Sequence, residues 1–118
     1  MRQPANQQKH DSIVSARAKE LLGEGNRVWA DVEGYSPPQP VFGYIPDIIA
    51  NGIWNLISEI ETSDSYSSDH THSQLCAFDS AGNYSLEAVV PESVYEAARR
   101  LFTVTWGISI DSWRTFQG

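Results

Sequence analysis

The chain has 118 residues, which is the length of one domain. Its 41% hydrophobic and 19% charged residues are ordinary for a globular protein, and no apolar run approaches the roughly 20 residues of a membrane span. A net charge of −7 argues against a broad basic face that binds nucleic acid by charge alone, although carboxylates that hold a divalent ion would themselves contribute to this charge.

The N-terminal stretch, residues 1–9, is polar and lacks the apolar segment of a secretory signal. Cys76 is the one cysteine in the sequence, so an intrachain disulfide cannot form. A reducing, cytoplasmic location is therefore the default expectation. We expect residues 1–9 to be flexible and residues 10–118 to form a single domain.

The first predicted element is a helix over residues 10–22. Val14, Ala18 and Leu21 recur there at the spacing of one helical face, which predicts that they pack into the core. Glycines directly after Leu22 end the helix.

Three strands are expected next, each recognised by its alternation or by a short apolar run. They cover residues 26–35, 41–50 and 53–62. The Asn51-Gly52 pair predicts a tight two-residue turn, which makes the second and third strands antiparallel. Pro46 lacks a backbone N–H, so strand pairing is expected to end or bulge near it.

The C-terminal half alternates helix and strand. The predicted elements are a helix from about Asp69 to the SAGN stretch, a strand over 84–90, a helix over 92–106 and a strand over 108–116. Leu75 and Phe78 should face inward from the first of these helices. Val94, Ala97, Ala98 and Leu101 form the apolar stripe of the second. This order predicts an α/β fold with a mixed sheet covered by helices.

Three carboxylates interrupt the apolar strands: Asp47, Glu59 and Glu61. Glu59 and Glu61 are two residues apart and point to the same side of a strand. A two-residue turn would place Asp47 opposite residues 54–56, so a bulge at Pro46 is needed to bring it near Glu59. If the three converge, their oxygens suit Mg²⁺ or Mn²⁺. The alternative is that they lie on a solvent-exposed edge.

The pattern Gly43-Tyr44-Ile45-Pro46-Asp47, eleven further residues and then Glu59-Ile60-Glu61 resembles the PD-(D/E)xK nuclease superfamily. That group includes type II restriction endonucleases and archaeal Holliday-junction resolvases. Its α-β-β-β-α-β order is similar to the elements expected over residues 10–90. The resemblance implies a restriction-endonuclease-like fold with an αβββαβ core and a C-terminal αβ extension. It also implies a divalent-metal-dependent endonuclease that hydrolyses DNA phosphodiester bonds.

The resemblance assigns roles to five residues. Asp47 and Glu59 would bind Mg²⁺ or Mn²⁺, and Glu61 occupies the position that usually holds lysine, as in the ExE form of some restriction enzymes. Glu20 matches an accessory acidic residue of the first helix. Gln74, four residues before Phe78, resembles the QxxxY motif with Phe in place of Tyr.

Two further questions stay open at this point. His70, His72 and Cys76 offer a metal site, since His72 and Cys76 are four residues apart on a helix, but Asp69 would have to serve as the fourth ligand. His70, His72 or Gln74 at the helix start could instead contact phosphate. The alternative to both is a polar helix start with a buried small cysteine. A domain of this size has no room for a separate DNA-recognition domain. We therefore expect a homodimer or a partner protein that supplies DNA contacts, with Trp29 and Trp54 as candidate dimer residues. The alternative to a nuclease is a catalytically inactive module that keeps the fold and binds nucleic acid or protein.

Overall fold

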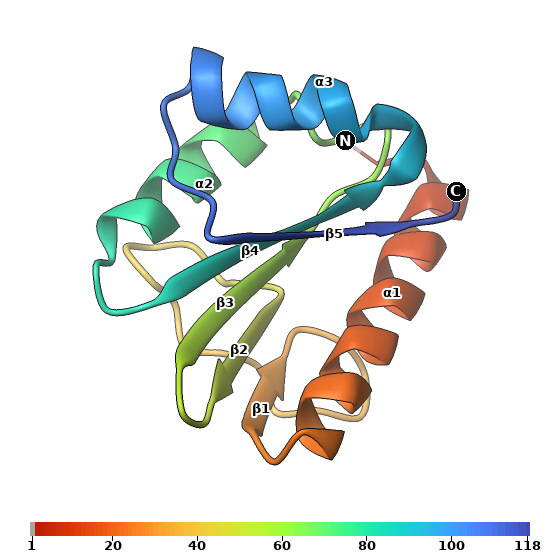
Figure 1. The fold of residues 1–118 in the computed structure, drawn as a ribbon. Coiled ribbons are helices and arrows are strands. Elements are labelled where there is room, and N and C mark those ends of the chain that lie inside the picture. Colours follow the sequence, from red (N-terminus) through yellow and green to blue (C-terminus); the bar gives the residue numbers. More distant parts are fainter. Residues whose placement is uncertain (1) are drawn as a thin grey trace.

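Five strands form one mixed sheet in the computed structural model, which describes residues 2–118 (Figure 1). The strands are β1 (Arg27–Ala30), β2 (Ile48–Asn51), β3 (Asn55–Ile60), β4 (Ser85–Pro91) and β5 (Ser112–Phe116). They lie side by side in chain order. β1, β2 and β3 pair antiparallel, whereas β3, β4 and β5 pair parallel. The predicted α/β class and the mixed sheet are therefore confirmed.

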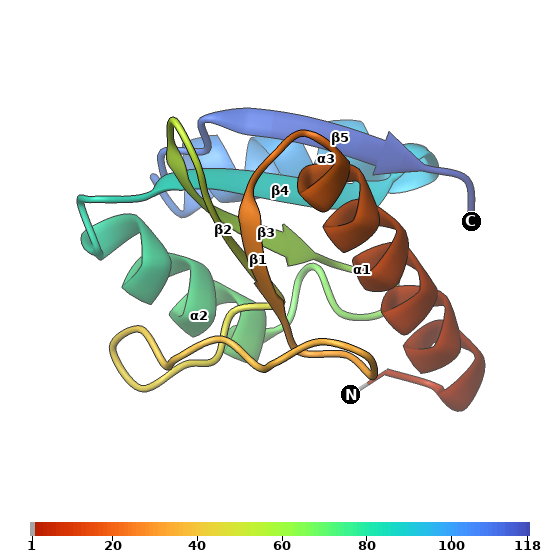
Figure 2. The same cartoon turned by 90° about the horizontal axis from the view of Figure 1, so that it is seen from below.

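The helices cover both faces of this sheet. They are α1 (Pro4–Gly23), α2 (Asp69–Ser80) and α3 (Tyr95–Arg100), the last flanked by a 3₁₀ turn (Glu92–Val94) and a π-helical turn (Leu101–Thr105). Two views place α1 and α2 on opposite sides of the strands (Figures 1 and 2). Within residues 2–118, no helix has the length and apolar character needed to cross a membrane.

Two apolar clusters fill the space between the helices and the sheet. On the α1 side, Val14, Ala18 and Leu21 are buried as the helical spacing predicts, and they pack with β2 and β3 residues. On the other side, Leu75 and Phe78 of α2 pack with Phe102 and the opposite faces of the same strands. Alternate residues of each central strand therefore face different helices, as strand geometry requires.

The turn between β2 and β3 is wider than predicted. Asn51 pairs with Asn55, so the connection is the three residues Gly52, Ile53 and Trp54 rather than a two-residue Asn51-Gly52 turn. The loop is one residue longer than predicted and also begins one residue later, so Ala50 pairs with Leu56 rather than with Ile53. As a result, Ile48 pairs with Ser58, and the expected position of Asp47 opposite residues 54–56 is wrong.

The N-terminal helix is longer than predicted. It begins at Pro4, a residue suited to the first helical turn because it has no N–H to leave unpaired. Residues 4–9, which the sequence suggested would be flexible, are therefore helical, and residue 1 lies outside the described residues. The extra turns extend α1 to the carboxylates that end the β2–β3 hairpin.

Several strands and the last helix differ from their predicted bounds. β1 ends at Ala30, and the stretch 31–47 is mostly irregular, with a single bridge between Val41 and Tyr44. The helix predicted over 92–106 is divided into three short segments, and its Ala97 is exposed whereas Ala98 is buried.

A buried ion pair joins α1 to the middle of the sheet. Arg17 donates from Nε and Nη2 to the two carboxylate oxygens of Glu87, each at 2.9 Å, and Ser58 Oγ donates to Glu87 Oε1 at 2.7 Å. The Arg17 and Glu87 side chains are only 9% and 4% exposed. Burial would lower the pKa of Arg17, but the hydrogen bond to Glu87 and its charge raise the pKa above its ordinary value.

We predict that Arg17→Met destabilises the fold by about 3–5 kcal/mol, because it leaves the Glu87 carboxylate buried without its cation. The double variant Arg17→Met/Glu87→Gln should recover most of that loss, since the amide oxygen still accepts from Ser58. Urea unfolding measures both, with the exposed Arg114→Gln as a control that changes stability little. A double variant as unstable as the single one would contradict this account.

Candidate functional site

The three carboxylates singled out from the sequence line one cavity of about 530 Å³. Asp47 lies one residue before β2, Glu59 lies near the end of β3, and Glu61 follows that strand. The antiparallel hairpin therefore brings the start of one strand beside the end of the next. Segments from α1 and α2 complete the cavity wall.

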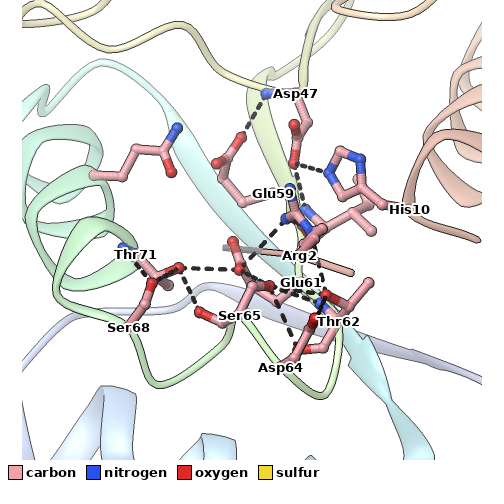
Figure 3. Close-up of polar contacts among 12 residues, drawn as sticks. Arg2, His10, Asp47, Glu59, Glu61, Thr62, Asp64, Ser65, Ser68 and Thr71 are labelled. Atoms are coloured by element: carbon pink, nitrogen blue, oxygen red, sulfur yellow. Dashed lines mark hydrogen bonds and ion pairs between the residues drawn. The ribbon is translucent and has the colours of Figure 1, made fainter. Parts of the chain in front are cut away.

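The observed hairpin register places Asp47 next to Glu59 without a bulge. Ile48 pairs with Ser58, so Asp47 and Glu59 are the next opposed positions. The Asp47 backbone N–H donates to Glu59 Oε2 at 2.5 Å, and the Ile60 N–H donates to Asp47 Oδ2 at 2.9 Å. Each carboxylate is thus held by the backbone of the opposite strand (Figure 3).

Glu61 is fixed by the sheet and by the loop that leads into α2. Its backbone N–H donates to Val89 O at 2.9 Å, which extends the parallel pairing of β3 with β4. Its Oε1 accepts from Ser65 Oγ at 2.8 Å and from Thr71 Oγ1 at 3.0 Å. Ser68 caps the start of α2 by accepting from the Thr71 N–H, which places the Thr71 hydroxyl beside the carboxylate.

The first half of α1 supplies residues that sequence analysis missed. His10 is buried, and its two ring nitrogens lie 3.2 Å from Asp47 Oδ2 and 3.0 Å from Asp11 Oδ1. Arg2, just before the helix, lies with its Nη2 3.6 Å from Glu61 Oε1. The sequence around Arg2 and His10 carries no pattern that predicts their contacts with the carboxylates. These contacts depend on the length of α1 and on its angle to the sheet.

Burial and mutual repulsion make this cavity unfavourable for three negative charges. Burial, and then the charge of Asp47, raise the pKa of Glu59 well above its ordinary value of 4.5. The same two causes raise the pKa of Glu61, opposed by the Ser65 and Thr71 hydroxyls and by Arg2. Burial would lower the pKa of His10, but its bond to Asp47 and the Asp47 charge raise it instead.

Each of the three carboxylates keeps one oxygen free. Within residues 2–118, Asp47 Oδ1, Glu59 Oε1 and Glu61 Oε2 accept no hydrogen bond from the protein, and none of these atoms is sealed from solvent. The described residues contain no three His, Cys, Asp or Glu side chains already gathered closely enough to hold a metal ion. Binding an ion between these oxygens therefore requires the carboxylates, which repel each other, to move together.

The other two residues that the nuclease resemblance indicated are placed differently. Gln74 of α2 lines the cavity and donates from Nε2 to Ile45 O at 3.4 Å. Glu20 does not line it. Its exposed carboxylate lies 3.5 Å from both Arg17 and Arg114, and the position on α1 that faces Asp47 belongs to His10. The expectation that Glu20 assists the carboxylates is wrong, because α1 presents an earlier turn to the site.

The three remaining candidates do not form a common cluster. His70 lines the cavity beside Tyr44, with ring centroids 5.9 Å apart. His72 instead stacks on Trp106 at 4.3 Å, and Cys76 is exposed. A zinc site made of His70, His72 and Cys76 is therefore not present in the described residues.

The fold and the site together define an α/β protein with a carboxylate-lined cavity at one end of its β2–β3 hairpin. In comparisons with known proteins, no family model, no curated protein and no solved structure matches the chain.

The raised pKa values predict how stability depends on pH. Above pH 4.5 an unfolded chain loses protons that Glu59 and Glu61 still hold in the folded protein, so the free energy of unfolding falls as pH rises. His10 acts with the same sign above pH 6.5, where the unfolded chain gives up a proton that the folded state retains.

We therefore predict that Glu59→Gln flattens this decline and stabilises the metal-free protein at pH 7 by about 1 kcal/mol, or about 4 °C in Tm. Thermal unfolding from pH 4 to pH 8 measures it. Glu96→Gln, a change of an exposed carboxylate on α3, serves as the control and should follow the wild-type curve. A Glu59→Gln curve parallel to wild type would show that the Glu59 carboxylate is not under this stress.

Proposed function

We propose that the protein is a divalent-metal-dependent endonuclease with a restriction-endonuclease-like fold, which hydrolyses DNA phosphodiester bonds in this cavity. The observation that carries the proposal is the set of three free carboxylate oxygens, one each from Asp47, Glu59 and Glu61, that open into one cavity. Buried carboxylates without cations are unfavourable, and a divalent ion is the common means of stabilising them.

The donor chemistry of the site fits Mg²⁺ or Mn²⁺. All three candidate ligands are carboxylate oxygens, which these hard ions prefer. The backbone bonds to Asp47 and Glu59 hold their second oxygens in place, so the free ones remain directed to the cavity. A bound ion would stabilise the charge of the phosphate and lower the pKa of a bound water.

The residues of the chain would divide the remaining work. Glu61 would accept the proton of the attacking water, with its Oε1 held by the hydroxyls of Ser65 and Thr71. The water oxygen forms a bond to phosphorus while the bond from phosphorus to the leaving oxygen breaks. The water proton passes to Glu61, and the leaving oxygen takes a proton from solvent. Gln74 and His70, which line the same cavity, are placed to orient the phosphate or the water.

The acidic surface makes a second chain a reasonable part of the proposal. A net charge of −7 gives little general attraction for DNA, so a homodimer or a partner protein would supply further contacts. The β2–β3 loop offers an apolar contact surface, because Ile53 is 93% and Trp54 is 75% exposed. Trp29, the other tryptophan considered for a dimer face, packs partly against the core.

The alternative function is a catalytically inactive module that binds nucleic acid or protein. Glu61 at the usual lysine position favours it, as does the separation of the carboxylates in the metal-free chain. The two functions differ in one outcome, since only the nuclease cuts DNA when a divalent ion is present.

We predict that Mn²⁺ or Mg²⁺ stabilises the wild type, by about 2.7 kcal/mol when the ion is at a hundredfold excess over its Kd. Asp47→Asn keeps an acceptor for the Ile60 N–H but removes the charge, so its Tm should respond to the ion much less. The Tm of the wild type and of Asp47→Asn is measured at increasing concentrations of the ion. Glu96→Ala, which removes an exposed carboxylate, is the control. Equal shifts in wild type and Asp47→Asn would refute the site.

Cleavage is then tested on supercoiled, branched and single-stranded DNA. We expect metal-dependent cutting by the wild type, lowered at least a hundredfold in Glu59→Gln, the range found when a transition-state-stabilising group is lost. If the wild type binds the ion but cuts no substrate, the inactive module is the better account. Equal cutting by Glu59→Gln and wild type would exclude catalysis in this cavity.

A further inference from the structure

Arg2 is anchored at the mouth of the carboxylate cavity. Its Nη2 donates to Ile60 O at 3.1 Å and its Nε donates to Thr62 Oγ1 at 3.2 Å. The next residue is also held, because the Gln3 N–H donates to Asp64 Oδ2 at 2.8 Å. Three hydrogen bonds therefore connect the chain before α1 to the end of β3 and the loop after it. Figure 3 shows Arg2 beside Glu61 and Thr62.

With its carboxyls ionised, as metal binding requires, the cavity carries more negative than positive charge. Its lining contains five carboxylates, one guanidinium and two imidazoles: Asp11, Asp31, Asp47, Glu59 and Glu61, with Arg2, His10 and His70. A DNA phosphate that enters adds another negative charge. One divalent ion cannot balance this total, so the phosphate needs a further cation, and Arg2 is the lining residue that is charged at every working pH.

The geometry of Arg2 leaves it able to bind a ligand. Its side chain is 20% exposed, and within residues 2–118 Nη1 makes no hydrogen bond and is not sealed from solvent. Nη2 lies 3.6 Å from Glu61 Oε1, which is an ion pair without a hydrogen bond. Arginine matches the spacing of phosphate oxygens and binds them more strongly than a neutral donor does.

We propose that Arg2, just before α1, binds a non-bridging oxygen of the scissile DNA phosphate and so provides the positive charge that position 61, a glutamate, does not. This inference rests on the proposed function, since the phosphate is that of the same substrate. Arg2 thereby has two functions: it offsets the Glu61 charge in the free protein and holds the phosphate beside the carboxylates in the complex.

The test measures DNA binding separately from cleavage. Binding of a labelled oligonucleotide is followed by anisotropy, with and without Mg²⁺, in a Glu59→Gln background so that the DNA stays intact. We expect Arg2→Gln to weaken binding about tenfold at low salt and to reduce the slope of log K against log salt by about 0.7–0.9, the value for one phosphate contact.

Two variants separate charge from structure. Arg2→Lys loses the bonds to Ile60 and Thr62 but keeps the positive charge. Because the phosphate interacts with this charge, the DNA affinity of Arg2→Lys should stay within about threefold of that of the Glu59→Gln parent. Arg99→Gln removes an exposed arginine that pairs with Glu96 on α3, and it should leave the salt slope unchanged. Thermal unfolding of each variant confirms that the fold is intact.

The outcomes distinguish this inference from the function on which it rests. If Arg2→Gln binds DNA as Arg99→Gln does, or if Arg2→Lys is as weak as Arg2→Gln, the phosphate contact is refuted. If the parent binds no DNA under either condition, both the contact and the nuclease are refuted. If it binds but the wild type cuts nothing, the nuclease fails, and the binding data alone decide the role of Arg2.

Discussion

The structure depends on the placement of three carboxylates where little water reaches them. Asp47, Glu59 and Glu61 meet because β2 and β3 run antiparallel and a three-residue loop sets their register. Desolvation and the charge of Asp47 both disfavour the ionised forms of Glu59 and Glu61, which compensating contacts or a bound cation would stabilise. The pKa values of Glu59 and Glu61 are raised for this reason.

The neighbouring elements are arranged as partial compensation. α1 presents His10 to Asp47, and the chain before it presents Arg2 to Glu61. Ser65 in the loop before α2 and Thr71 in the first turn of α2 donate hydroxyl hydrogen bonds to Glu61. None of these contacts occupies all the carboxylate oxygens. These free carboxylate oxygens can still bind a cation, which is the physical basis for proposing a metal ion. The phosphate contact is proposed because Arg2 lines the same cavity.

The part of this site that lies on one hairpin was accessible from the sequence. Alternation along β3 predicts that Glu59 and Glu61 share a side, and the hairpin brings Asp47 close to them. The predicted register was wrong because the turn signal at Asn51-Gly52 fixes neither the length of the loop nor its first residue, and both change every pairing of the hairpin. The predicted strand over 41–50 begins only at Ile48, because apolar composition alone does not distinguish a strand from an irregular segment, here one with Phe42 and Ile45 exposed.

The contribution of α1 was not predictable in the same way. Residues 4–9 have the polar composition of a flexible end, yet Pro4 begins a helix there, and Arg2 just before it bonds the end of β3. Glu20 was chosen by its position in a helix assumed to start at His10. Which turn of a helix meets a sheet depends on packing across the core, here by Val14, Ala18 and Leu21, and not on any local pattern.

If Asp47, Glu59 and Glu61 form a cation site, binding of the ion must displace the protons that the raised pKa values of Glu59 and Glu61 retain. Calorimetric titration with Mn²⁺ at pH 7, in two buffers of different ionisation enthalpy, counts the protons that leave when the ion binds. We expect the wild type to release protons when Mn²⁺ binds. The number released should be smaller in Glu59→Gln and the same as in wild type in Glu96→Gln. Binding with no proton release, or no binding at all, would contradict the cation site.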